Sequence, residues 1–113
     1  MIVKDGADCR FMRPELTGRL WTIEQVFLYH APEGYQFVIT SGTDGKHAVN
    51  SLHYKGLAVD CRRWYWDNGQ RRDLGIDTLY KIRADLRRSL GTDWDIVLET
   101  SHVHIEYDPK GVA

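Results

Sequence analysis

Apolar residues recur at helical spacing in two stretches of the chain, separated by about three to four positions each time. The first stripe consists of Leu16, Leu20, Ile23 and Phe27. The second consists of Leu79, Ile82, Leu86 and Leu90. Pro14 suits the first turn of a helix, and Gly91 suits a position just beyond a helix end. The pattern therefore predicts helices over residues 14–30 and 77–90.

Shorter apolar segments with strand-like composition lie between and after these helices. They cover residues 35–40, 57–61 (with a possible extension to 64), 95–98 and 102–107. Turn signals fall at 41–45 and 67–69, and residues 46–56 are expected to form an ordered loop. The last two strands are only a few residues apart, which favours a hairpin. The order predicts an α+β domain with a small, mainly antiparallel sheet and helices packed on one face.

Length and charge narrow the classes of function. A chain of 113 residues with a net charge of −1 fits a single domain, residues 1–113, and gives no electrostatic case for binding nucleic acid or an anionic membrane. No apolar run is long enough for a membrane span, and the first residues lack the apolar core of a signal peptide. We therefore expect synthesis in the cytoplasm. A monomer is expected, because no heptad or dimer-forming patch is visible.

The two cysteines do not form a disulfide framework. Cys9 and Cys61 are far apart in sequence and lack the C-x-x-C spacing of a metal site or redox motif. Cys61 follows Asp60 in a strand-like segment, so its side chain is expected on the opposite face, buried as a small apolar group.

The last predicted strand alternates polar and apolar residues. One face carries His102, His104 and Glu106, and the other carries Val103, Ile105 and Tyr107. The ordinary interpretation is a polar face on an edge strand. Two histidines and a carboxylate on one face also suit a metal ion.

A second segment strengthens the metal interpretation. Asp60 lies between the apolar residues Val59 and Cys61, where a carboxylate is costly to bury unless a partner such as a cation compensates its charge. His53 lies seven residues earlier, and Gly56 allows the chain to bend back so that the two side chains converge. Alone, the pair is equally compatible with a loop histidine and a turn aspartate.

Together, the two segments resemble a known pattern. Ser-x-His-x-x-Gly-x-Ala-x-Asp is matched at Ser51, His53, Gly56, Ala58 and Asp60, and a late His-x-His is matched at His102 and His104. This is similar to zinc peptidases of the D-alanyl-D-alanine carboxypeptidase type and to the wider hedgehog/DD-peptidase superfamily. Short chains of this type look especially like bacteriophage endolysins.

The resemblance implies a zinc site with three protein ligands, His53, Asp60 and His104, and water in the open position. It also implies a general base, for which Glu99 is the best candidate, and a role for His102 in binding the oxyanion or sharing the proton transfer. One departure concerns the base. The carboxypeptidase branch places its acidic residue three positions before the last histidine, where this chain has Ser101.

The implied substrate is a peptidoglycan stem peptide. Ser51 and Ser41 are expected to contact it, and Arg62, or alternatively Lys46 or Arg63, to bind one of its carboxylates. Trp64 and Trp66 are expected to pack in the core and cleft wall, or to stack on glycan. The resemblance favours an endolysin-like peptidase that acts on the cell wall as a phage lysin. The alternatives are a D-alanyl-D-alanine carboxypeptidase and a non-catalytic zinc-binding module.

Overall fold

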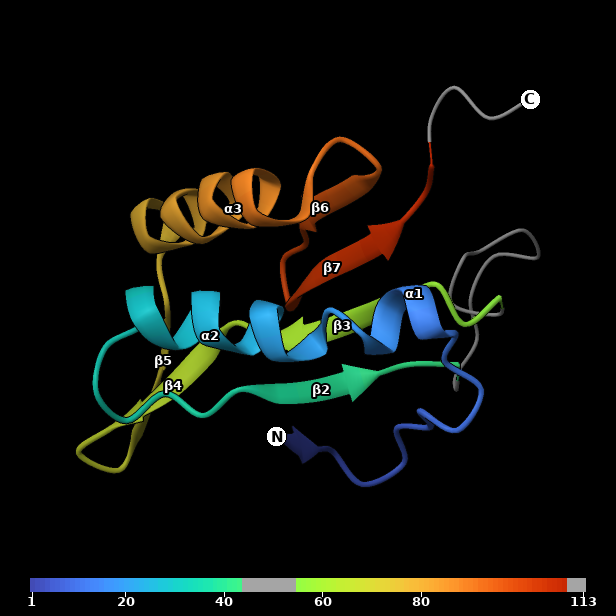
Figure 1. The fold of residues 1–113 in the computed structure, drawn as a ribbon. Coiled ribbons are helices and arrows are strands. Elements are labelled where there is room, and N and C mark those ends of the chain that lie inside the picture. The colour runs from blue at the N-terminus through green and yellow to red at the C-terminus, as the bar shows by residue number, and fades with distance from the viewer. Residues whose placement is uncertain (44–54, 110–113) are drawn as a thin grey trace.

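The computed structural model describes residues 1–43 and 55–109. Its elements, in chain order, are β1 (Ile2–Val3), α1 (Pro14–Thr17), α2 (Leu20–His30), β2 (Val38–Ser41), β3 (Ala58–Arg62), β4 (Trp64–Asp67), β5 (Gln70–Asp73), α3 (Ile76–Leu90), β6 (Trp94–Leu98) and β7 (His102–Tyr107) (Figure 1). The predicted combination of a small sheet with helices is confirmed.

Five of the strands form one sheet in the order β1-β2-β3-β7-β6. Neighbouring strands are antiparallel except for β1 and β2, which are parallel. The predicted hairpin of the last two strands is confirmed as β6 and β7. The remaining strands, β4 and β5, pair as a separate hairpin. Its two-residue loop, Asn68-Gly69, has positive φ angles of 49° and 78°, as expected for a type I′ turn.

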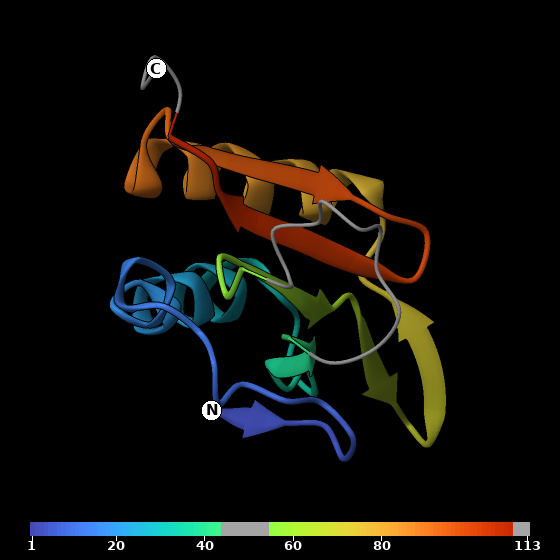
Figure 2. The ribbon, with the colours of Figure 1, turned by 90° about the vertical axis from the view of Figure 1, so that its right-hand side faces the viewer.

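The helices and the apolar core lie on one face of the sheet. Figure 2 shows α3 behind β6 and β7, and α2 packs against α3. The fully buried core residues of the two central strands are Val59, Cys61, Val103 and Ile105. Because strand residues alternate, Asp60, His102 and His104 lie on the other face, away from the helices. Cys61 is buried and free, as predicted.

The prediction of one continuous helix over residues 14–30 is wrong. Residues 14–30 form two helices, because α1 ends at Thr17 and α2 begins at Leu20. Gly18 lies at this break, where the low helix propensity of glycine weakens the continuation. Leu16 and Ile23, on either side of it, are nonetheless fully buried in the core. Within the described ranges, no helix is long and apolar enough to cross a membrane.

The strand predictions differ from the structure mainly at their edges. β2 begins at Val38 rather than Tyr35 and includes Ser41, which the sequence assigns to a turn. β3 ends at Arg62, and Trp64 begins a different strand. β1, β4 and β5 have no counterpart among the predicted elements. The predicted loop over 46–56 falls largely outside the described residues, which resume with a turn at 55–56.

Candidate metal centre and cleft

Two of the predicted zinc ligands are direct partners across neighbouring strands. Asp60 on β3 is paired with His104 on β7, and Oδ1 of Asp60 lies 2.9 Å from Nδ1 of His104. The aspartate is only 6% exposed although it is charged. Nε2 of His102 lies 3.5 Å from the same carboxylate oxygen. Two imidazole rings therefore converge on one buried carboxylate.

The second nitrogen of His104 is held by another carboxylate. Its Nε2 lies 3.0 Å from Oε1 of Glu106, two residues along the same strand. Burial opposes protonation of the ring, but the hydrogen bonds and charges of Asp60 and Glu106 together raise the pKa of His104 above its ordinary value. Such a carboxylate commonly fixes the orientation of a metal-binding histidine and leaves its other nitrogen for the ion.

Two of the three predicted zinc ligands lie among the described residues, and their side chains suit a zinc ion. A carboxylate oxygen and an imidazole nitrogen, from Asp60 and His104, are ligand types that zinc accepts. The third predicted ligand, His53, lies outside the described residues, as does the predicted substrate contact Ser51. Their positions relative to Asp60 therefore stay predictions.

A different group of acids can also hold a cation. Ligand oxygens of Asp95, Glu106 and Asp108 all lie within 4.8 Å of one another. This is a generic acidic cluster without preference for zinc, and it was not among the predicted sites. Glu106 belongs to it and also contacts His104, so the two candidate ion sites are neighbours on one face of the sheet.

A β-bulge brings Ser41 to the face that carries Asp60. Ile39 pairs with Cys61, but Ser41 pairs with Asp60, so Thr40 is an extra residue in the ladder. In a regular ladder Ser41 would lie opposite Val59 and on the core face, since a shift of one residue exchanges the faces of a strand. The bulge instead lets both Thr40 and Ser41 line a cleft.

This cleft has a volume of about 460 Å³ and runs along the polar face of the sheet. Its lining residues are Lys4, Thr40, Ser41, Asp60, Arg62, Trp64, Arg71, Ser101 and His102. Four of the predicted site residues, Ser41, Asp60, Arg62 and His102, thus share one concave surface. A polar cleft that contains a buried carboxylate is a reasonable substrate site.

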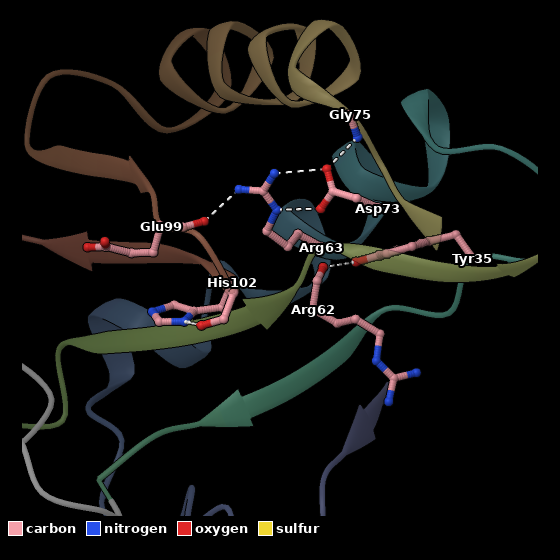
Figure 3. A network of polar contacts seen from close by, with 8 residues as sticks. Tyr35, Arg62, Arg63, Asp73, Gly75, Glu99 and His102 are labelled. Carbon is pink, nitrogen blue, oxygen red and sulfur yellow. Dashed lines mark hydrogen bonds and ion pairs between the residues drawn. The ribbon is translucent and has the colours of Figure 1, made fainter. Parts of the chain in front are cut away.

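The predicted base, Glu99, lies at the turn between β6 and β7. Its side chain is exposed and does not line the cleft. The turn is nevertheless well tied, because the backbone N–H of Glu99 donates to the carbonyl of His102 at 3.0 Å. Its own carbonyl accepts from Nη1 of Arg63 at 2.6 Å (Figure 3). Nδ1 of His102 lies 2.8 Å from the hydroxyl of Ser101.

The two neighbouring arginines have different surroundings. Arg63 contacts the Asp73 carboxylate through Nε and Nη2, at 2.7 and 2.9 Å, so its guanidinium is already engaged. Figure 3 shows the side chain of Arg62 extending away from that of His102. Of the alternatives considered for a carboxylate anchor, Arg62 alone lines the cleft, and Lys46 lies outside the described residues.

Searches against protein-family models, curated proteins and solved structures returned no match to this chain. The resemblance to the zinc peptidases therefore stays an expectation based on the motif residues and on their arrangement.

Two cleft residues were missed by sequence reasoning. Lys4 and Arg71 line the cleft but were not considered, whereas Trp64 lines it as expected for a cleft-wall residue. The Asn68-Gly69 turn is a signal that could have located Arg71. Read as a two-residue hairpin, it pairs Trp66 with Arg71 and brings the basic strand beside the aromatic one.

Proposed function

We propose that this chain is a zinc-dependent peptidase that hydrolyses amide bonds in peptidoglycan stem peptides, as an endolysin-like endopeptidase. The observation that carries the proposal is the pairing of Asp60 with His104 at 2.9 Å, with His102 beside them. Asp60 and His102 also line the cleft. The substrate class comes from the motif resemblance, since zinc chemistry alone would serve any amide.

The proposed zinc ligands are His53, Asp60 and His104, with Glu106 orienting the last of them. When bound, zinc would supply Lewis-acid polarisation of the scissile carbonyl and a water of lowered pKa. His102 borders the cleft and can donate a hydrogen bond from Nε2 toward an oxyanion. Glu99 would accept the water proton and return it to the leaving amine.

One observation favours a second candidate, a non-catalytic zinc-binding module. The side chain of Glu99 is exposed and outside the lining of the cleft, so its carboxylate must turn toward the metal for it to act as base. A binding module has no need of a base. A D-alanyl-D-alanine carboxypeptidase, by contrast, would use the same machinery on a different bond.

The test is mass spectrometry of defined muropeptides after incubation with zinc-loaded protein, with a chelator-treated sample as control. A product with cleavage inside the stem, absent with chelator, would support the endolysin-like function. Loss of one terminal alanine would instead identify a carboxypeptidase. Intact muropeptides, with one equivalent of zinc verified by elemental analysis, would overturn the peptidase in favour of the binding module.

A further inference from the structure

Three cationic side chains line the cleft together with a single carboxylate. Lys4, Arg62 and Arg71 contribute the positive charges, and Asp60 contributes the negative one. The whole chain has nearly balanced charge, with 15 basic and 16 acidic residues. The excess of positive charge is therefore a local property of this cleft, and it favours an anionic ligand.

The two arginines are held by the same tryptophan. The guanidinium carbons of Arg62 and Arg71 lie 3.8 and 4.1 Å from the ring centroid of Trp64. Both guanidiniums therefore lie over the same indole. Stacking of this kind orients a guanidinium while leaving its N–H edge free to donate.

The guanidinium of Arg62 also lacks part of its hydration. Its Nε is buried and has no hydrogen-bond partner among the described residues. Burial is the first cause that lowers the pKa of Arg62, and the nearby charge of Arg71 adds to it. A partly dehydrated cation beside a like charge attracts an anion more strongly than a fully solvated one does.

We propose that Arg62, Trp64 and Arg71 form a carboxylate-binding subsite at one end of the cleft, with Lys4 adding long-range attraction. The proposal deepens the proposed function, on which it rests for the nature of the ligand as a peptide. Asp60 and Arg62 are two residues apart on one strand, which corresponds to roughly 7 Å between their Cα atoms. The subsite would therefore bind a carboxylate of a peptide whose scissile bond lies near Asp60.

The test is an NMR titration of the full chain, which requires neither zinc nor hydrolysis. The probes are N-acetyl-D-alanine, its uncharged C-terminal amide, and inorganic phosphate. The Arg62 Nε–H and Trp64 indole N–H resonances report binding, and the Arg62 signal is assigned by its loss in Arg62→Lys. We expect saturable shifts with the carboxylate and none with the amide. Equal shifts with both, or with neither, would overturn the proposal, and tighter binding of phosphate would replace the carboxylate as ligand.

A matched pair of variants localises the effect. Arg71→Gln removes one exposed charge from beside Trp64 and should weaken carboxylate binding by roughly tenfold. Arg72→Gln removes the same charge from the next residue, which pairs with Asp67 instead, and should leave binding within twofold. Equal weakening in both variants would reduce the subsite to a general charge effect and overturn it. Failure of the peptidase assay with a positive titration would reject the proposed hydrolysis alone.

Discussion

The side chain of Arg63 donates a hydrogen bond of 2.6 Å to the backbone carbonyl of Glu99, 36 residues further along the chain. Asp73 on the β4–β5 hairpin accepts two further hydrogen bonds from the same guanidinium and one from the backbone N–H of Gly75. The hairpin is thereby linked to the turn that carries the proposed base. We regard Arg63 and Asp73 as positioning residues, because neither side chain lines the cleft.

Replacement of Asp73 by asparagine should loosen this turn. Because Asp73 is about half exposed, we expect a loss of only about 0.5–1 kcal/mol in the free energy of unfolding. Hydrogen exchange at the Glu99 amide, which is bonded to His102, should accelerate. Asp67→Asn is the matched control, since it breaks the Arg72 pair on the same hairpin. Unchanged exchange at Glu99 in Asp73→Asn would exclude a positioning role.

The identity of the metal site is tested by a pair of aspartate variants. Asp60→Asn should abolish stoichiometric zinc binding, as measured by elemental analysis and by loss of the thermal shift on zinc addition. Asp95→Asn removes a carboxylate from the acidic cluster alone and should bind zinc normally. Zinc binding that is retained in Asp60→Asn and lost in Asp95→Asn would show instead that the metal site is formed by Asp95, Glu106 and Asp108.

The zinc content of variants distinguishes the roles of Glu99 and His102 from those of the proposed zinc ligands. Glu99→Gln and His102→Ala should each keep one equivalent of zinc and lower the rate of muropeptide cleavage by about 10²–10⁴-fold. Zinc loss in His102→Ala would make His102 a ligand, which its 3.5 Å distance from the Asp60 carboxylate permits. Full activity in Glu99→Gln would remove Glu99 from the mechanism.

Acid should weaken the contact between the two long helices. Oδ2 of Asp85 lies 2.8 Å from Nε2 of His30, and this hydrogen bond is the first cause that lowers the pKa of Asp85, with help from Arg88. The carboxyl pKa is thus lower in the folded chain than its unfolded value of roughly 3.9. Its stabilising contribution is complete above that value and is lost as the pH falls through the folded pKa.

The measurement is urea unfolding at pH 7 and pH 3. Stability of the unmodified chain should fall on acidification by on the order of 1 kcal/mol more than that of Asp85→Asn. Asp77→Asn, in the first turn of the same helix, controls for the loss of a carboxylate. Parallel pH profiles for the unmodified chain and Asp85→Asn would show that the pair does not contribute.

Sequence patterns predicted the helices and strands in which the spacing of apolar residues matches their burial. β7 alternates polar and apolar residues, and its predicted bounds, His102 to Tyr107, are those of the structure. β5 was missed because its four residues are all polar and all exposed. Only its pairing with β4 makes it a strand, and pairing is a tertiary property.

Strand alternation predicts on which face of a strand each candidate site residue lies, but it does not predict which strands are neighbours. Alternation puts Asp60 and His104 each on a polar face, but the adjacency of β3 and β7 depends on a strand order that sequence does not contain. The bulge at Thr40 is likewise invisible in sequence, although it decides which face Ser41 joins. Arg71 reaches the cleft through the hairpin alone.

The alternation of β3 and β7 also has a consequence for how this chain tolerates mutation. Val59 and Ile105 face the helices, whereas their immediate neighbours Asp60 and His104 lie on the opposite, polar face of the sheet. A saturation library scored for both melting temperature and zinc content should therefore show two interleaved profiles with a period of two residues. Substrate specificity could then be evolved at the residues on the polar face of these strands, while the residues on the core face are left unchanged to preserve the fold.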